Sequence, residues 1–438
     1  MTITIRRRAL AALAAAGLSL AGAAGAQASA EFPALAVQPN GTSHFAWVNQ
    51  DNRIGERAWP AAQSNPLAAT VISTGTASEV DVASNAAGDT AFVWLRQSPS
   101  AFAAHVEARR RNADGTLGPV LNLTPGYAGD APRVAISSNG SAFAVWQRDS
   151  YVLGRRISAD GVLGKQKIFS AAGYASSSPD VAMDGTGAAI VIWKRRDQKA
   201  NTEVVQAIRV AGNDTVGVVK TLGPSSTAMQ DPRVGIDQDG DAVLGWLEWD
   251  GQRYVPSLRV RRSVGTFSDI DRLFSGGPSA AHLQLAVNAA GDATAVWERG
   301  NATIRTIELR RRAADGTLGL LRTMSSEGTD TYPESPQVAM DADGGAYVVW
   351  LQHPGANANA NRVVHGRGRT PAGTLTAIQQ LSQSGEYAHQ PRVGVADSGN
   401  ATIAWGVITG GQPSAYRVDA RRRIANGGGL TAIKTIAG

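Results

Sequence analysis

Seven polar side chains occupy one recurring position in the chain, directly after a proline or its substitute in a short apolar segment. They are Asp81, Arg133, Asp180, Arg233, Gln284, Gln337 and Arg392. Guanidinium groups pair well with carboxylates, phosphates and sulfates, so these residues would bind an anionic ligand if the fold brings them together. Ordinary solvated polarity at the centre of a repeat structure is the alternative interpretation.

Tyrosines recur in the polar segments that precede these positions. Tyr127, Tyr174, Tyr332 and Tyr387 take related places in four repeats. A tyrosine on a rim can stack on a sugar ring or a peptide, because its ring is apolar and its hydroxyl is polar. Tyr127, Tyr174 and Tyr387 are therefore added to the predicted ligand-binding residues, with anchoring of the loops as the other interpretation.

Catalytic groups are harder to find in the sequence. A glycosidase needs two carboxylates about 5–10 Å apart, and the candidates fall in five different repeats: Asp81, Asp130, Asp180, Asp231 and Glu334. No nucleophile-elbow, phosphate-loop or HExxH motif occurs, and the six histidines lack metal-ligand spacing. Segments 237–241 and 341–344 are interpreted as hairpin turns, because neither is followed by the glutamate of a calcium loop. We predict no catalytic residue, no metal site and no cofactor.

The elements that must position these residues come from a repeat. A glycine and a tryptophan recur six residues apart, eight times, without a change in spacing. The pairs are Gly41 and Trp47, Gly88 and Trp94, Gly140 and Trp146, Gly187 and Trp193, Gly240 and Trp246, Gly291 and Trp297, Gly344 and Trp350, and Gly399 and Trp405. Eight copies predict eight structural repeats in which these residues are structural.

Each repeat is predicted to contain four strands. A proline lies eight residues before the glycine in six repeats, and three residues after the proline site only Ala or Gly occurs. The segment alternates with period two, which predicts a strand that begins at the proline and lies innermost. A hairpin glycine, a buried strand ending at the tryptophan, a more polar third strand and a short outer strand follow.

The predicted fold is an all-β, eight-bladed β-propeller of four-stranded antiparallel blades. The proposed repeats are about 31–77, 78–130, 131–177, 178–230, 231–280, 281–334, 335–389 and 390–438. Each blade is contiguous, so blade 8 should pack on blade 1 without an exchanged strand. Seven blades with extra hairpins, or a β-solenoid, are the alternatives.

Residues 1–30 are predicted to be a secretory signal peptide. Arg6–Arg8 precede a small, apolar run, and Ala28-Ser29-Ala30 matches a signal-peptidase site. Their removal leaves 408 residues with 39 basic and 36 acidic side chains, a net charge of +3, so nucleic acid is not an expected partner. The chain has no cysteine, which excludes disulfides and thiolate chemistry. We expect a secreted or periplasmic monomer without a transmembrane segment after cleavage.

The pattern P-x-V-A-x-D-x-x-G-x-A-x-V-x-W is clearest at 179–193 and 336–350. It resembles the repeats of secreted bacterial β-propeller proteins of unassigned function. The resemblance covers the whole chain after residue 30 and implies the fold, but it implies no chemistry. Sialidases, quinoprotein dehydrogenases and kelch proteins have different spacings, and no functional residue is taken from them.

The two faces of such a propeller should differ. The loops between the second and third strands, and those between consecutive blades, share one face (the loop face), and their lengths vary widely. Function tends to lie on variable loops held by a rigid scaffold, so we predict binding of an acidic glycan, an envelope polymer or a protein there. The alternative is a carbohydrate-active enzyme, a glycosidase or a lyase. Arginines such as Arg310–Arg312, which end the third strands, are interpreted as exposed charge that prevents edge pairing.

Overall fold

The computed structural model describes residues 31–97, 104–301, 305–326, 331–354, 361–409, 415–425, 427 and 429–438. The predicted signal peptide, residues 1–30, lies outside the described residues and stays a prediction. Within the described part of the chain, no helix has the length and hydropathy that crossing a bilayer requires.

The described strands form eight separate four-stranded antiparallel sheets, each built from consecutive strands. The first four blades are β1 (Glu31–Val37), β2 (Ser43–Val48), β3 (Ile54–Trp59) and β4 (Thr70–Val71); β5 (Ala77–Ser84), β6 (Thr90–Arg96), β7 (His105–Arg111) and β8 (Leu121–Asn122); β9 (Asp130–Ile136), β10 (Ala142–Arg148), β11 (Tyr151–Ile157) and β12 (Lys167–Ile168); β13 (Ala175–Met183), β14 (Ala189–Asp197), β15 (Thr202–Val210) and β16 (Lys220–Thr221).

The last four blades repeat this arrangement. They are β17 (Met229–Ile236), β18 (Ala242–Trp249), β19 (Tyr254–Arg261) and β20 (Asp271–Arg272); β21 (Ser279–Val287), β22 (Ala293–Gly300), β23 (Arg305–Arg312) and β24 (Arg322–Thr323); β25 (Thr331–Met340), β26 (Ala346–Pro354), β27 (Val363–Arg369) and β28 (Gln379–Gln380); β29 (Tyr387–Val395), β30 (Ala401–Thr409), β31 (Ala415–Arg423) and β32 (Lys434–Ala437).

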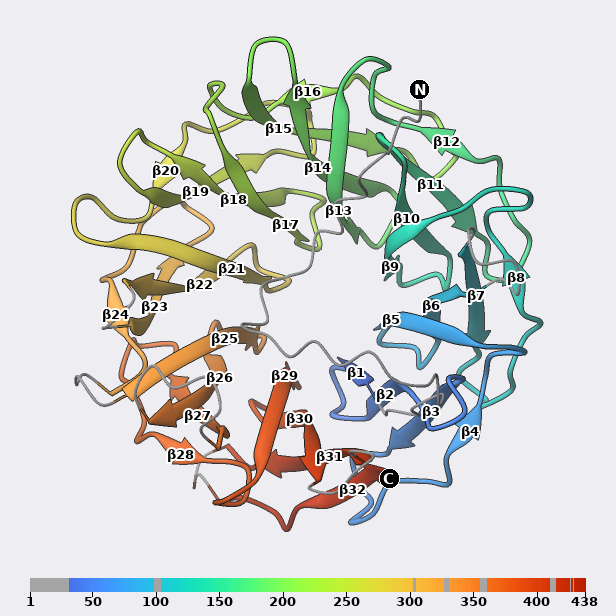
Figure 1. Ribbon diagram of the computed structural model, residues 1–438, viewed down its shortest axis with the longest axis vertical. Helices are drawn as coiled ribbons and strands as arrows, with labels where there is room; N and C mark the ends of the chain where they lie inside the picture. The colour runs from blue at the N-terminus through green and yellow to red at the C-terminus, as the bar shows by residue number, and fades with distance from the viewer. Residues whose placement is uncertain are drawn as a thin grey trace, which may run out of the picture.

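The blades stand in a ring around a central axis, which confirms the predicted eight-bladed β-propeller (Figure 1). The first strand of each blade lies innermost and contacts the first strands of both neighbours, from β1 against β5 around to β29 against β1. Because the first strand continues the loop that joins two blades, each inner strand enters the channel from the loop face. The opposite face carries the tight turns within blades and is called the turn face.

The inner strands are closely packed, which explains the small residue in each of them. At Gly235 of β17, an added Cβ would lie 2.4 Å from a methyl group of Val287 on β21 in the next blade. Gly394 of β29 meets Val37 of β1 at the same distance. Only Gly or Ala fits this position, because neighbouring inner strands converge on the axis.

The predicted place of the proline is wrong in detail. Strand β13 begins at Ala175, and Pro179 is its fifth residue. The pairing register with β14 jumps from Ser177 to Asp180, so the proline falls in a β-bulge where no ladder hydrogen bond is needed. The residue before the proline site has positive φ in seven blades, at Glu79, Ala131, Ser178, Asp231, His282, Ser335 and Gln390.

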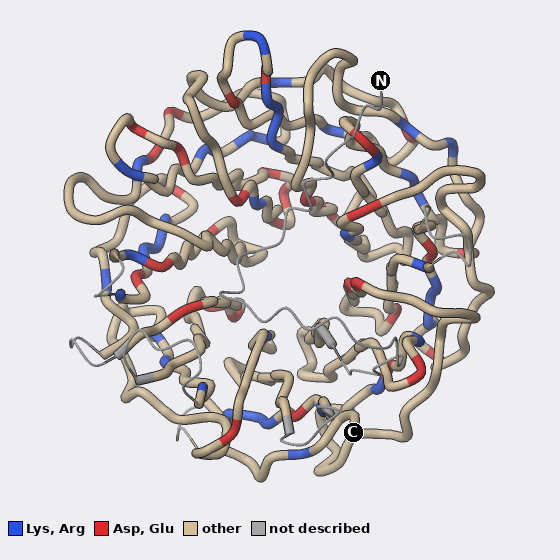
Figure 2. Tube along the Cα trace, in the orientation of Figure 1, with Lys and Arg blue, Asp and Glu red and all other residues tan. Residues whose placement is uncertain are grey.

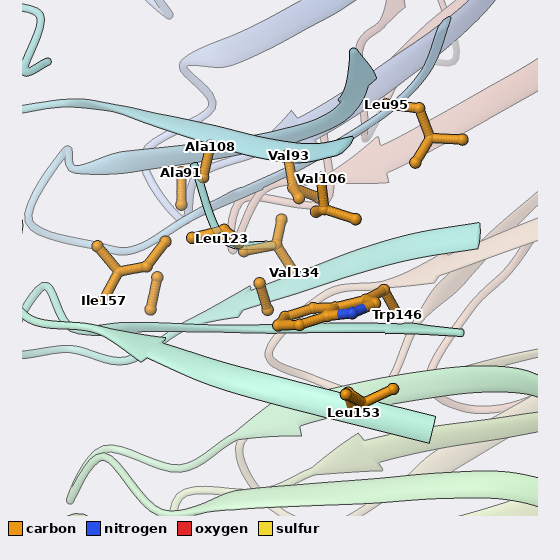
Figure 3. Close-up of a cluster of buried hydrophobic side chains, with 12 residues drawn as sticks. Ala91, Val93, Leu95, Val106, Ala108, Leu123, Val134, Trp146, Leu153 and Ile157 are labelled. Carbon is orange, nitrogen blue, oxygen red and sulfur yellow. The ribbon is translucent and has the colours of Figure 1, made fainter. Parts of the chain in front are cut away.

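The tryptophans of the second strands fill the spaces between blades. Seven of the eight are fully buried, and Trp47 is 4% exposed. Figure 3 shows Trp146 of β10 among side chains from two blades, with Val93 and Val106 on one side and Leu153 on the other. Burial of large aromatic surfaces between sheets gives each blade most of its attraction to its neighbours.

The third-strand arginines are clamps between blades, which corrects their interpretation as exposed edge charge. On β23, Arg310 Nε donates to the carbonyl of Gly319 at 2.9 Å, and its Nη1 donates to the carbonyl of Leu273 in the preceding blade at 2.7 Å. The same two-carbonyl pattern occurs at Arg57, Arg109, Arg155, Arg259, Arg367 and Arg421. Blade 4 has Ile208 at this position. Figure 2 shows basic segments in the outer part of the ring.

The ring closes between blade 8 and blade 1 without an exchanged strand, as predicted. Arg422 of β31 donates to the carbonyls of Trp59 at 2.7 Å and Pro60 at 2.9 Å, and its guanidinium lies 4.2 Å from the Trp59 ring centroid. Ser43 and Thr402 join their hydroxyls across the same seam at 2.9 Å. Side-chain contacts therefore close the ring where an exchanged strand does so in other topologies.

Candidate functional site: the central channel and its loop-face mouth

The seven recurring polar residues lie at one level of the inner strands. Each follows the bulge by two residues, on β5, β9, β13, β17, β21, β25 and β29. They are therefore inside the channel, below the bulge residues that form its mouth, rather than at the mouth itself. Acidic and basic segments both occur near the axis in Figure 2. In blade 1 this position is Ala34, which is buried.

The two aspartates of this level are tied to the backbone of the next blade. Asp81 Oδ2 accepts the N–H of Val134 at 3.0 Å, and Asp180 Oδ2 accepts the N–H of Val234 at 3.0 Å. Desolvation raises the pKa of the Asp81 carboxyl, against the charge of Arg133, which lowers it; the charge of Asp180 adds to the rise. Both carboxylates therefore lie in one electrostatic environment, and both hold neighbouring blades together.

The three arginines of the same level are less well satisfied. Each donates a hydrogen bond to the carbonyl of the proline before it, at 2.8 Å for Arg133, 3.0 Å for Arg233 and 3.1 Å for Arg392. Among the described residues, no carboxylate oxygen lies within 4.0 Å of these three guanidinium groups. Desolvation, followed by repulsion from Arg133, lowers the pKa of Arg392 to about 10, which leaves it charged at neutral pH.

The glutamines contribute neutral polar groups. Gln284 Oε1 accepts a hydrogen bond from Arg233 Nε at 3.2 Å and so fixes one guanidinium against the next blade. Gln337 holds the matching position on β25 and is half-buried. Three arginines against two aspartates leave this level of the channel with an excess of one positive charge.

The mouth above this level carries ionisable bulge residues. His282 Nδ1 lies 2.7 Å from Glu298 Oε1, and the same oxygen accepts the N–H of Ser335 in blade 7 at 2.7 Å. The hydrogen bond from Glu298 raises the pKa of His282, against desolvation, which lowers it. Asp231 Oδ2 accepts the N–H of Leu283 at 3.1 Å. The mouth therefore repeats the tie between carboxylates and the next blade.

A second acidic pair lies at the mouth between blades 2 and 3. Desolvation and the charge of Asp130 both raise the pKa of Glu79, although Glu79 is exposed and water screens the effect. Asp130 Oδ1 also accepts the N–H of Ala131 at 2.8 Å. These carboxylates meet at a strained bulge and are accessible from the loop face.

The tyrosines of the loop face are all covered on one side by arginine. The Arg148 guanidinium carbon lies 4.7 Å from the ring centroid of Tyr127, and Arg195 lies 4.2 Å from that of Tyr174. Arg305 covers Tyr332 at 4.3 Å, and Arg362 covers Tyr387 at 5.0 Å. Tyr127 is 54% exposed, so one aromatic surface remains open beside a cation. Tyr332 is instead buried, and the structure does not bring the four rings into one group.

Glu334 is separated from the other predicted carboxylates. Its Oε1 lies 3.3 Å from Arg362 Nη1 and its Oε2 lies 3.9 Å from His353 Nε2. Desolvation raises the pKa of Glu334, but His353 and Arg362 outweigh it, so the pKa is lowered overall. Glu334 therefore stays ionised as part of a structural ion pair.

Sequence reasoning missed two features of this site. The positive φ of the bulge residues could not be predicted, because a residue before proline is expected to have an extended backbone. Their signal is the polar or small residue before each proline site, at the same place in seven repeats. The backbone ties of Asp81 and Asp180 left no signal in the sequence, because each partner is an N–H of the next blade.

No protein-family model matches the sequence, and no curated protein matches it. Among solved structures, the chain is similar to an ulvan lyase that is described as a new family of polysaccharide lyase and holds a saccharide containing GlcA. The TM-score is 0.52 at 6% identity, and the match covers 75% of this chain and 92% of that one. A second ulvan lyase structure gives 0.51 at 6% identity, with the same coverage. The β-propeller domain of the trilobed protease from Pyrococcus furiosus gives 0.46 at 7% identity, covering 80% and 92%. The likeness to the two ulvan lyase structures shows the fold alone.

Proposed function

We propose that this protein is an exported, non-catalytic binding propeller that engages an acidic glycan or envelope polymer through its loop face. One observation carries the proposal: three guanidinium groups share the channel without a carboxylate partner among the described residues. A carboxylate or sulfate entering from the mouth would supply that partner. Charge-assisted bonds of this kind are among the strong ones.

The surroundings favour an extended polymer over a free ion. Tyr127 and Tyr174, each paired with an arginine, are the rings on which we expect a glycan to stack outside the channel. Aromatic rings and guanidinium groups together suit sugars that carry acidic groups. A protein of this fold, the ulvan lyase, holds a saccharide containing GlcA, which makes uronate glycans the first ligands to test.

The test is calorimetric titration of residues 31–438 with polyuronates, sulfated glycans and neutral dextran, at about 20 and 150 mM salt. We expect a polyanion to bind at both salt concentrations, and Arg133→Gln or Arg392→Gln to weaken it about tenfold or more, as the loss of a charged hydrogen bond implies. The matched control is Arg262→Gln, which removes the same charge from the turn face, where Arg262 is paired with Asp241.

Two outcomes would count against this function. If binding disappears at the higher salt, or if Arg262→Gln weakens it as much as Arg133→Gln, the attraction is general charge and the channel is not the site. If no glycan binds, a protein partner for the loop face becomes the better explanation.

A second candidate, cleavage of a carbohydrate, is supported by two carboxyl groups with a raised pKa, Asp81 and Glu79, each of which has a second carboxylate acting on it, Asp180 and Asp130 respectively. Against it, three of these carboxylates already accept backbone N–H groups. Incubation with the bound glycan and measurement of new reducing ends separates the candidates. Cleavage that is lost in Glu79→Gln or Asp81→Asn would favour the enzyme.

A further inference from the structure

One tryptophan is less buried than the other nine. The chain has ten tryptophans, and nine are at most 4% exposed: the eight of the repeat and Trp59, which lies under Arg422. Trp249, at the end of β18, is half-buried instead. It lies on the loop face, three residues beyond the repeat tryptophan Trp246. A partly accessible indole with no place in the repeat calls for its own explanation.

Trp249 lines a shallow cavity of about 400 Å³ between blades 4 and 5, which is open to solvent. This volume is within the range of small-molecule sites. The rest of the lining comes from β15, β18, β20 and two loops and is mostly polar: Thr202, Ser225, Ser226, Thr227, Glu248, Asp250, Gly251 and Arg272. One aromatic surface among hydroxyl, carboxylate and guanidinium groups is unlike the apolar spaces between the blades.

The backbone around Trp249 is held from both sides. The Trp249 N–H donates to the carbonyl of Ala228 at 3.1 Å, and the Ser226 hydroxyl donates to the carbonyl of Trp249 at 2.6 Å. Asp250 Oδ1 accepts the N–H groups of Gln252 and Arg253, both at 2.9 Å, which fixes the hairpin turn. The indole also packs edge-on against Tyr254, with ring centroids 5.2 Å apart. The platform is therefore set before any ligand arrives, which lowers the cost of binding.

Glu248 adds an acceptor that the protein itself does not use. Its side chain is 5% exposed, and its Oε1 is bound by Arg272 Nη2 at 2.7 Å. Its Oε2 is buried and has no hydrogen-bond partner among the described residues. An unpartnered carboxylate oxygen is costly, and a ligand hydroxyl would remove that cost. Arg272 is 57% exposed and offers donors beside it.

We propose that this cavity binds a neutral pyranose unit, with its ring stacked on Trp249 and its hydroxyls bonded to Glu248 and Arg272. Sugar hydroxyls both donate and accept, which matches a carboxylate next to a guanidinium group. Glu248 is paired with Arg272 and Asp250 with Arg253, so the cavity has no excess positive charge that would favour an acidic sugar. The site shares no residue with the channel, so this inference goes beyond the proposed function and does not depend on it.

The test uses quenching of tryptophan fluorescence by acrylamide, because Trp249 is the accessible indole among ten. Neutral tetrasaccharides of glucose, xylose and mannose are added to residues 31–438 at up to about 10 mM, a range that includes weak specific binding. We expect at least one tetrasaccharide to protect Trp249, and Trp249→Ala to weaken its binding at least about tenfold. Glu248→Gln and Arg272→Ala should also weaken it. Because Arg272 is bonded to the buried Glu248 carboxylate, urea titration must first show that Arg272→Ala is folded.

The channel variant Arg133→Gln is the matched control. It should leave the neutral sugar bound, just as Trp249→Ala should leave any polyanion bound, so each site is judged separately. The inference is overturned if no tetrasaccharide protects Trp249, or if both Trp249→Ala and Arg272→Ala bind sugar as well as the unchanged protein. It is also overturned if a proline-containing peptide protects the indole and the sugars do not, since the platform would then recognise protein.

Discussion

Two sets of arginines, in the third strands and in the channel, use the same guanidinium group in opposite ways. Arg310 and its equivalents in six other blades bond to carbonyls on both sides of a blade boundary. Arg133 and Arg392 donate only to the carbonyl of the residue before them in the interactions that the structure describes. The third-strand arginines therefore bond to backbone carbonyls of two blades, whereas the channel arginines keep guanidinium N–H donors for a ligand.

This difference teaches how to interpret repeated charge in a repeat protein. A residue that recurs in nearly every blade meets the same backbone partners in each, so its partner belongs to the fold. A position whose identity changes from blade to blade, such as Asp81, Arg133 and Gln284, has no single partner in all blades: its aspartates accept an N–H of the next blade, and its arginines donate to the preceding proline carbonyl. Variation at a shared position is therefore the better indicator of a binding site.

The largest effect is expected where the ring closes. Arg422→Ala removes hydrogen bonds to the carbonyls of Trp59, Pro60, Ala61 and Gln63. The buried Trp59 carbonyl loses this donor, whereas the carbonyls of Pro60 and Gln63 keep one other donor each. We expect a loss of about 3–5 kcal/mol in the free energy of unfolding. Denaturant titration measures it, with Arg262→Ala on the exposed turn face as a control that should change stability by less than about 1 kcal/mol.

Within the ring, a single clamp should contribute less. Arg310→Ala removes two charge-assisted hydrogen bonds, to the carbonyls of Gly319 and Leu273, and should cost about 1.5–3 kcal/mol. Blade 4 does without this clamp, since Ile208 takes its place. Equal stability of Arg310→Ala and the unchanged protein in urea would show that these arginines are surface charge after all.

Removal of a channel arginine should have the opposite effect on stability from removal of a clamp arginine. The pKa of Arg392 is lowered to about 10, so its charged form is disfavoured in the folded protein. The unchanged protein should therefore gain stability as pH rises above about 10 toward the ordinary arginine pKa, and Arg392→Gln should lack this gain. At neutral pH the variant should be no less stable while losing affinity for polyanions. Thermal unfolding at pH 7 and pH 10.5 measures both; a loss at pH 7 comparable to that of Arg310→Ala would abolish the distinction.

The smallest effect on stability is expected from His282 at the channel mouth. The pKa of His282 is raised by its bond to Glu298, so this contact stabilises the folded protein fully below about pH 6.5 and is lost as pH rises through the raised value. His282 is 60% exposed, so we expect less than about 1 kcal/mol. His282→Gln should flatten the pH dependence of stability between pH 6 and 8. An unchanged slope would mean that Glu298 is held by Arg305 and Ser335 alone.

The fold could be predicted because its causes are local and repeated. The glycine of each hairpin has positive φ, from 77° at Gly399 to 107° at Gly88, so only that residue type fits the turn. The small residue of the inner strand, such as Gly235, records a contact with the next blade that leaves no room for a larger side chain. Eight copies of such constraints are visible without any structure.

The site could be predicted only in part. The shared level of Asp81, Arg133 and Arg392 follows from register, but their hydrogen bonds do not, because each depends on how far one blade is rotated against the next. Trp249 and Glu248 could not be predicted as a site, since a single half-buried indole has no periodic signal. Residues that do not recur in the repeats, such as these two, have no pattern from which their role could be predicted.

The seam between blades 8 and 1 has a consequence for how the chain can be rearranged. Because no strand is shared across it, the boundary between β29 and β1 (Figure 1) is held by the same kinds of contact as the other seven. No shared strand then fixes which blade must come first in the chain. A chain cut in any loop between blades and rejoined through its old ends would have the same eight sheets, so whole blades could be exchanged as modules without a partner strand having to follow.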